Sequence, residues 1–181
     1  MKNFFRLAEG LDVIPLLHAV YKNFDLWNQN KRRTDFGGHE EVESPHKDVD
    51  DILLRFSNNE GIGDQLVCEN TPAFARLPQA RPLVFALMAR VEGTILGRVM
   101  ITKLAPGQTI TPHADTAGKY ANYFSRYHIP LQSGPGTLFR ADDELVQMKP
   151  GEVWDFNAHA EHEVINNSTV DRIHLIVDIK S

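Results

Sequence analysis

The sequence has little of several features that mark particular protein classes. Cys68 is the single cysteine among 181 residues, so an internal disulfide is impossible and a cysteine-based zinc site lacks ligands. No apolar stretch approaches the roughly 18 to 20 residues that a membrane-spanning helix needs. A disulfide-stapled scaffold and a helical membrane protein are therefore excluded.

Positive charge is also scarce. Lys and Arg number 19 against 24 Asp and Glu, a formal net charge of −5, so no general basic surface is available for phosphate backbones. Arg6 and Glu9 interrupt the apolar residues at the N-terminus, unlike in a secretory signal. We therefore expect a soluble cytoplasmic protein that binds neither nucleic acid nor a membrane.

The remaining composition is that of an ordinary globular protein. Hydrophobic residues make up 42% and charged residues 24% of the chain. A chain of this length is expected to form one domain that buries about 70% of its extended-chain surface. We predict a single domain, residues 1–181, in which residues 1–93 are mainly helix and loop with a short strand and residues 94–181 form a β core.

Helical spacing dominates the N-terminal part. Apolar residues recur every three to four positions over residues 13–24 and over residues 82–91, and each pattern predicts an amphipathic helix. Residues 52–56 predict a short buried strand. Between the first helix and this strand, the strongly polar segment 28–51 predicts a surface loop or, alternatively, a lid over a bound substrate.

After Gly93 the pattern changes to short runs rich in Val, Ile, Thr, Tyr and Phe, separated by turn signals such as Pro150-Gly151. About seven short strands at close spacing predict a mainly β fold, an antiparallel barrel or jelly roll with the N-terminal helices packed on its outer face. The predicted strands are residues 95–104, 122–131, 137–141, 145–149, 152–156, 162–165 and 172–179.

A candidate metal site begins with His113 and Asp115, which an extended segment places on the same face. A histidine from a neighbouring strand would complete a set of two His and one carboxylate, the arrangement diagnostic of non-haem Fe(II) oxygenases. His162 and His159 compete for the third place. We favour His162, which begins a predicted strand, whereas His159 lies in the preceding loop, near the entrance of the site or without a role.

The predicted last strand supplies a cation. Its alternation places Arg172 and His174 on the face opposite the aliphatic residues, and hence toward the barrel interior. An interior guanidinium needs an anion. That anion is either a carboxylate of this chain, such as Asp155 or Glu163, or an incoming dicarboxylate.

Two further strands bring polar groups toward the same interior. Arg126 and His128 share one face of their predicted strand, and Thr102 lies in the strand that leads to His113. Two arginines and several histidines directed into one barrel need partners for their charges and hydrogen-bonding groups. A bound metal ion and a bound acid would supply these partners.

Together these residues resemble the aspartyl/asparaginyl β-hydroxylase family of Fe(II)- and 2-oxoglutarate-dependent oxygenases. The resemblance covers about residues 98 to 179, nearly half of the chain. The motifs that carry it are Ile101–Gly107, Thr111–Asp115, Arg126–His128, Gly151–Phe156, Glu161–Val164 and Asp171–Ile179.

The resemblance implies a double-stranded β-helix, which is a cupin-like fold, that uses Fe(II), 2-oxoglutarate and O2. The implied activity is hydroxylation of a C–H bond in a small amino-acid-like or peptidyl substrate, with release of succinate and CO2. The implied iron ligands are His113, Asp115 and His162. The implied contacts to 2-oxoglutarate are Arg172 and Thr102 at its distal carboxylate and Arg126 and His128 near its oxo-acid end.

One departure bears on the substrate. The best-known animal members of the family lack the carboxylate ligand, whereas this chain has Asp115 in that place. The chain thus resembles the short microbial members, some of which hydroxylate free amino acids. The alternatives are a cupin-like binding or regulatory module, in which Arg172 pairs internally, and a metal-dependent enzyme of the same fold that does not use 2-oxoglutarate. The sequence names neither the substrate nor the oligomeric state.

Overall fold

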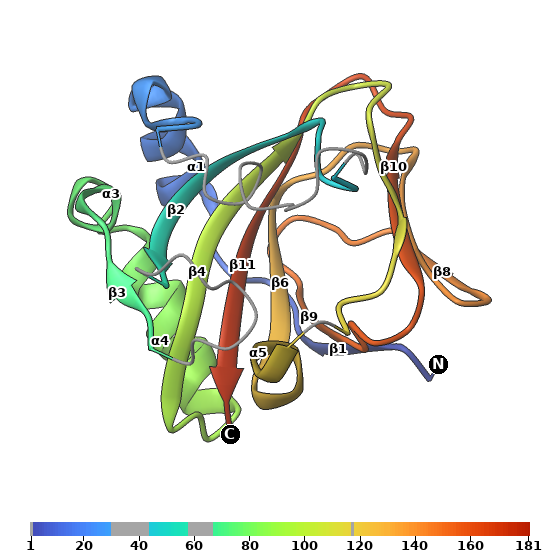
Figure 1. The fold of residues 1–181 in the computed structure, drawn as a ribbon. Coiled ribbons are helices and arrows are strands. Elements are labelled where there is room, and N and C mark those ends of the chain that lie inside the picture. Colours follow the sequence, from blue (N-terminus) through green and yellow to red (C-terminus); the bar gives the residue numbers. More distant parts are fainter. Residues whose placement is uncertain (1, 30–43, 58–66, 117) are drawn as a thin grey trace.

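The computed structural model describes residues 2–29, 44–57, 67–116 and 118–181. Two antiparallel sheets form the molecule (Figure 1). The larger sheet has the order β1-β9-β6-β11-β4-β2-β3, and the smaller sheet has the order β5-β10-β7-β8. The strands of the larger sheet are β1 (Phe4–Ala8), β2 (Val49–Phe56), β3 (Glu69–Asn70), β4 (Ile95–Leu104), β6 (Ser125–Gln132), β9 (Val153–Phe156) and β11 (Arg172–Lys180).

The smaller sheet and the helices complete the described fold. The strands of the smaller sheet are β5 (Thr109–His113), β7 (Thr137–Ala141), β8 (Glu144–Val146) and β10 (His162–Asn166). The helices are α1 (Ile14–Lys22), the 3-10 turn η1 (Phe24–Leu26), α3 (Pro72–Arg76), α4 (Ala80–Arg90) and α5 (Gly118–Tyr123). Among the described residues, no helix combines the length and the apolar character needed to span a membrane.

Helices α1, α3 and α4 cover the outer face of the larger sheet, as predicted, whereas α5 lies on the cavity side. Leu16 of α1 and Val84 of α4 belong to one buried apolar cluster with Ile129, Leu175 and Val177 of the central strands. Each fully buried aliphatic side chain of this kind contributes about 1.5–3 kcal/mol relative to exposure. The mainly β fold with helices packed outside is therefore confirmed.

The strand at the centre of the larger sheet, β11, faces two different environments. Its aliphatic residues Ile173, Leu175, Val177 and Ile179 pack in the cluster under the helices. The intervening residues point to the opposite face, because side chains alternate along a strand. The predicted orientation of Arg172 toward the interior is confirmed.

Some elements differ from the sequence-based prediction. The strand expected over residues 122–131 begins at Ser125, because residues 118–123 form α5. Strands β1 and β5 were not predicted, since each is short and β5 contains Pro112. A proline is tolerated there because β5 lies at the edge of its sheet.

The N-terminal part contributes more strand than the short segment expected at residues 52–56. Strand β1 pairs with β9 and strand β2 pairs with β4, so strands from both sides of residue 94 share the larger sheet. The end of the polar segment 28–51 belongs to β2, and most of the remainder of the proposed lid, residues 30–43, lies outside the described residues.

Candidate active site

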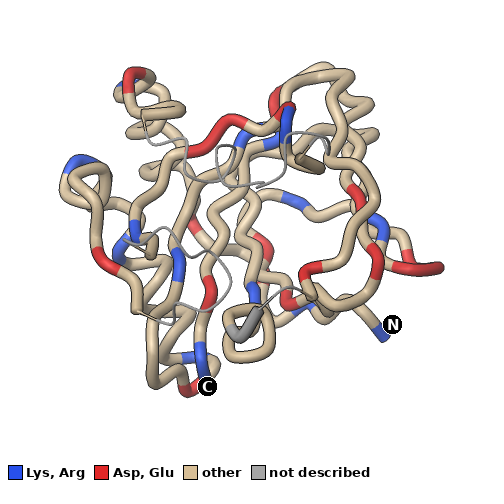
Figure 2. The backbone as a smooth tube through the Cα atoms, in the orientation of Figure 1, with Lys and Arg blue, Asp and Glu red and all other residues tan. Residues whose placement is uncertain are grey.

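A cavity of about 450 Å³ lies between the sheets. This volume is in the range of sites for small molecules, about 300–1,000 Å³. Charged residues occur on the strands of the larger sheet as well as at the outer loops (Figure 2). Strands β4, β6 and β11 of the larger sheet each contribute side chains to the cavity wall. These are Arg98, Met100, Thr102, Arg126, His128, Arg172, Ile176 and Asp178.

Three potential metal ligands meet at the wall of the cavity formed by the smaller sheet. The pairing of β10 with β5 places His162 opposite His113, and Asp115 follows two residues after His113. One ligand atom from each of the three residues lies within 4.8 Å of the others. The structure therefore brings together the three residues that the sequence predicted as iron ligands.

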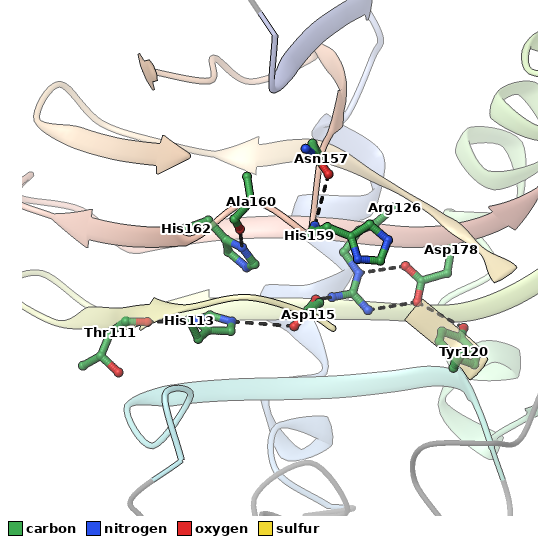
Figure 3. A network of polar contacts seen from close by, with 10 residues as sticks. All are labelled: Thr111, His113, Asp115, Tyr120, Arg126, Asn157, His159, Ala160, His162 and Asp178. Carbon is green, nitrogen blue, oxygen red and sulfur yellow. Dashed lines mark hydrogen bonds and ion pairs between the residues drawn. The ribbon is translucent and has the colours of Figure 1, made fainter. Parts of the chain in front are cut away.

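Backbone carbonyls orient both imidazoles (Figure 3). Nδ1 of His113 lies 2.8 Å from the carbonyl oxygen of Thr111, and Nδ1 of His162 lies 2.9 Å from that of Ala160. A carbonyl only accepts, so each Nδ1 carries the proton and each Nε2 presents a lone pair. Nε2 of His113 is buried and has no hydrogen-bond partner among the described residues.

The protonation states of His162 and Asp115 suit a metal ion. Burial lowers the pKa of His162, which favours the neutral imidazole. Burial acts to raise the pKa of Asp115, but the adjacent positive charge of Arg126 acts in the opposite direction, and the pKa of this carboxyl is lowered. Neutral imidazoles and an ionised carboxylate are the forms that bind a divalent cation, so the donor set fits one.

The carboxylate of Asp115 is held by a chain of polar contacts (Figure 3). Arg126 donates a hydrogen bond from Nη1 to Asp115. The same guanidinium donates from Nε and Nη2 to the two oxygens of Asp178, at 2.9 and 3.1 Å. Asp178 is 1% exposed and also accepts a 3.1 Å hydrogen bond from the Tyr120 hydroxyl. The ligand set is thus connected to the larger sheet.

Arg172 lines the same cavity, and its buried guanidinium forms no ion pair with a carboxylate of the described residues. Its side chain is 2% exposed, and Nη2 has no hydrogen-bond partner in the described part of the chain. Burial lowers the pKa of this guanidinium to about 9. The internal carboxylates considered from the sequence do not pair with it, because Glu163 binds Arg140 at 2.6 Å and Asp155 forms no ion pair with a described residue.

Two more predicted residues, Thr102 and His128, line the same cavity as Arg172. Thr102 is 3% exposed, and its hydroxyl oxygen has no hydrogen-bond partner among the residues described. Thr102 lies opposite His174 across the β4–β11 pairing. Nδ1 of His174 lies 3.3 Å from Nδ1 of His128, so one of these two imidazoles donates to the other.

His159 is not among the three residues whose ligand atoms converge. It is exposed, and its backbone N–H donates to the Asn157 side chain at 3.2 Å (Figure 3). Asp178 and Tyr120 were given no role from the sequence. The one available signal was the alternation of β11, which placed Asp178 on the interior face with Arg172.

A family model described as aspartyl/asparaginyl beta-hydroxylase matches residues 42–181 of the chain. L-proline cis-4-hydroxylase of Rhizobium meliloti (strain 1021) is 26% identical over 120 residues, which cover 65% of this chain and 42% of the relative. L-proline cis-3-hydroxylase 2 of a Streptomyces species is 22% identical over 175 residues, which cover 96% of this chain and 55% of the relative. The chain thus spans about half the length of these curated relatives, or less.

Solved structures share the fold. A prolyl hydroxylase from Trichoplax adhaerens, in complex with a peptide fragment of a hypoxia inducible factor, has a TM-score of 0.65 at 10% identity, covering 99% of this chain and 84% of that one. A 2OG-Fe(II) oxygenase family oxidoreductase from Burkholderia pseudomallei has a TM-score of 0.58 at 15% identity, covering 77% and 71%. These likenesses confirm the predicted double-stranded β-helix.

Proposed function

Because the chain belongs to the aspartyl/asparaginyl β-hydroxylase family, we propose that it is an Fe(II)- and 2-oxoglutarate-dependent hydroxylase of a small free amino acid. The observation that carries the proposal is the buried guanidinium of Arg172, which has no carboxylate partner among the described residues and lines the same cavity as the three convergent metal ligands. Such a cation is costly to bury unless an anion joins it.

The proposed iron ligands are His113, Asp115 and His162. When bound, iron together with 2-oxoglutarate supplies the oxidising chemistry that transfers one oxygen atom of O2 to a C–H bond, with succinate and CO2 as co-products. These three side chains would hold the ion. The carbonyl groups of Thr111 and Ala160 fix the two rings, and Arg126 fixes the carboxylate.

Arg172 and Thr102 are proposed to bind the distal carboxylate of 2-oxoglutarate. The planar fork of a guanidinium matches two carboxylate oxygens, and a hydroxyl donates a further hydrogen bond to the same group. Both residues are buried, so these bonds are protected from competition with water. The co-substrate would thereby satisfy polar atoms that are unpaired in the described protein.

Arg126 and His128 are proposed to lie near the oxo-acid end. A guanidinium carries five N–H donors. Arg126 uses three of them on Asp178 and Asp115, which leaves two for a ligand. His128 lines the cavity between Arg126 and the Arg172 end, on strand β6.

The amino-acid substrate is proposed from the relatives and from the cavity. Both curated relatives described above are L-proline hydroxylases. The cavity has an apolar side formed by Phe56, Met100 and Ile176, which suits the aliphatic part of a small substrate. Free L-proline is therefore the first substrate to examine, and a proline-containing peptide is the alternative.

Anaerobic binding followed by turnover tests the proposal. We expect iron-loaded protein to bind 2-oxoglutarate in isothermal calorimetry and to release succinate faster when the correct amino acid is present. Iron-loaded protein without 2-oxoglutarate affinity would exclude the proposal and would favour a binding module or a metal enzyme of another type. Stimulation by peptides alone would exclude the free amino acid as substrate.

A further inference from the structure

Helix α5 lies in the chain between the two partners of an ion pair at the candidate metal site. It follows Asp115, a proposed metal ligand, and precedes Arg126, the residue that binds Asp115. A helix of six residues is too short to be stable through its own backbone hydrogen bonds. Contacts with the rest of the protein must therefore hold this helix in place, and Tyr120 supplies several of them.

The hydroxyl of Tyr120 joins α5 to two strands of the larger sheet. It accepts a 2.7 Å hydrogen bond from the backbone N–H of Arg98 on β4, and it donates a 3.1 Å hydrogen bond to Oδ2 of Asp178 on β11. A backbone N–H can only donate, so the single proton of the hydroxyl is directed to the carboxylate. Burial and the charge of Asp178 raise the pKa of Tyr120, so the hydroxyl keeps this proton.

Close packing surrounds this tyrosine. Tyr120 is 4% exposed, its ring centre lies 4.5 Å from that of Phe124, and the guanidinium carbon of Arg98 lies 3.9 Å from the same ring centre. A Cβ atom at Gly97 would lie 2.6 Å from the Tyr120 hydroxyl oxygen and 2.9 Å from a ring carbon of Phe124. Both separations are shorter than real Cβ contacts, so a larger residue at Gly97 would displace one of the two side chains. The absence of this Cβ allows the hydroxyl to reach the backbone of β4.

A chain of hydrogen bonds leads from the hydroxyl to a proposed metal ligand (Figure 3). Oδ2 of Asp178 accepts from the Tyr120 hydroxyl and from Nη2 of Arg126, each at 3.1 Å. Nη1 of the same guanidinium donates to Asp115. Because a guanidinium is planar and rigid, its N–H groups move together. The position of Asp178 therefore determines the direction from which Nη1 reaches Asp115.

The same tyrosine also forms part of the cavity wall. Tyr120 and Ala121 line the cavity from α5, and Phe124 lines it just after the helix. None of the three residues whose ligand atoms converge belongs to α5. The helix thus supports a ligand that it does not itself supply.

We propose that Tyr120 is a positioning residue for the metal site, whose hydroxyl holds Asp178 and thereby, through Arg126, fixes the orientation of Asp115. The proposal rests on the proposed function only in taking Asp115 as a metal ligand. Metal binding alone can therefore test it, without turnover.

Removal of the single hydroxyl is the test. Tyr120→Phe keeps the ring in its apolar cluster and deletes only the oxygen that binds Asp178 and the β4 backbone. Residues that orient metal ligands typically change metal affinity by about 10–100-fold when they are substituted. Because Tyr120 acts through two other side chains, we expect the lower end of this range, a loss of about tenfold in anaerobic Fe(II) titrations.

A double variant separates this role from a general effect on folding. The hydroxyl acts through the carboxylate, so Tyr120→Phe should weaken Fe(II) binding no further in protein that already carries Asp178→Asn. Independent structural effects would instead multiply the two losses. The visible absorption of Co(II) bound to the protein depends on ligand geometry, so it should shift in Tyr120→Phe.

Tyr123→Phe is the matched control on the same helix. The Tyr123 ring packs against Phe124 and lies 5.6 Å from the Lys180 ammonium, and its hydroxyl takes no part in the chain that leads to Asp115. Its Fe(II) affinity should change less than about twofold. If Tyr120→Phe does not fold, Gly97→Ala serves instead. Its methyl group would displace the Tyr120 hydroxyl and should lower Fe(II) affinity by about tenfold with every side chain of the network retained.

The outcomes distinguish the two proposals. Full Fe(II) affinity in Tyr120→Phe, an equal loss in Tyr123→Phe, or multiplied losses in the double variant would each overturn the positioning role. If the protein binds Fe(II) but not 2-oxoglutarate, the hydroxylase proposal fails, and the positioning role is decided by the Fe(II) titrations alone. If the protein binds no Fe(II), both proposals fail.

Discussion

Arg126 and Asp178 form a two-point ion pair next to the candidate metal site, with Nε–Oδ1 and Nη2–Oδ2 distances of 2.9 and 3.1 Å. Both lie on adjacent strands of the larger sheet, where Asp178 is opposite Arg126. The remaining amino group of the guanidinium binds Asp115. Asp178, which is not itself in the ligand set, therefore determines where one of the ligands is held.

Asp178→Asn is the first prediction. The amide removes a charge from the ion pair and leaves Arg126 less firmly held, so Asp115 loses its fixed orientation. Partners that orient metal ligands typically change metal affinity by about 10–100-fold. We expect a loss of that size in anaerobic Fe(II) titrations. Asp171→Asn, just before the same strand, is the matched control, and equal losses in both variants would contradict the argument.

The second prediction concerns Arg172, for which stability and binding should change in opposite directions. Arg172→Met removes a buried charge that lacks a carboxylate partner among the described residues, so the ligand-free protein should be stabilised by about 1–3 kcal/mol. Its melting temperature should no longer respond to 2-oxoglutarate. Thermal unfolding with and without the co-substrate measures both effects.

Arg172→Lys is the companion variant. An ammonium cannot form two parallel hydrogen bonds to a carboxylate, so 2-oxoglutarate affinity should recover only in part. A methionine variant that is strongly destabilised would indicate that the guanidinium has a structural role, as a binding module without a co-substrate would require.

The ligand set gives the third prediction. His113→Ala, Asp115→Ala and His162→Ala should each lower Fe(II) affinity by more than about 100-fold, because each removes a proposed direct ligand. His159→Ala should change it less than about threefold, since His159 is exposed and lies outside the convergent group. Circular dichroism verifies that each variant is folded. A larger loss at His159 than at His162 would assign the third ligand position to His159.

The fourth prediction is a pH dependence of stability that arises from Asp155. Burial raises the pKa of this carboxyl from 3.8 to about 6. The folded protein thus favours the protonated carboxyl of Asp155. The contribution of this group to the free energy of unfolding is complete below pH 3.8 and is lost as the pH rises through about 6.

Asp155→Asn removes this titration. At about pH 8 the variant should be more stable than the unmodified protein, by on the order of 1 kcal/mol because the carboxyl is partly solvated, and near pH 4 the two should be equal. Denaturant unfolding at the two pH values measures the difference. A stability gap that does not change with pH would show that ionisation of Asp155 is not its source.

The sequence predicted those parts of the fold and site that depend on local spacing. The alternation along residues 172–179 fixed which side chains face the helices, and the spacing of His113 and Asp115 placed both on one face. These patterns need no knowledge of distant segments, because two-residue periodicity is a property of the strand itself.

Contacts that depend on strand register were not predictable in this way. The pair of Arg126 with Asp178 joins residues 52 positions apart, and it exists only because β6 and β11 align in one register. The contact of Arg98 with Tyr120 depends on α5, a helix within a segment whose aromatic residues favoured a strand. Tertiary packing decided both outcomes.

One feature of β11 constrains how this protein can change over evolution. The same nine residues supply alternately the packing surface for the helices and the wall of the cavity. A shift of one position would exchange the two sets of side chains. Arginine and histidine would then face the apolar core under the helices, and leucine and valine would line the cavity. An insertion or deletion of one residue within this segment would therefore be strongly destabilising, whereas a substitution at a cavity-facing position leaves the packing face in place.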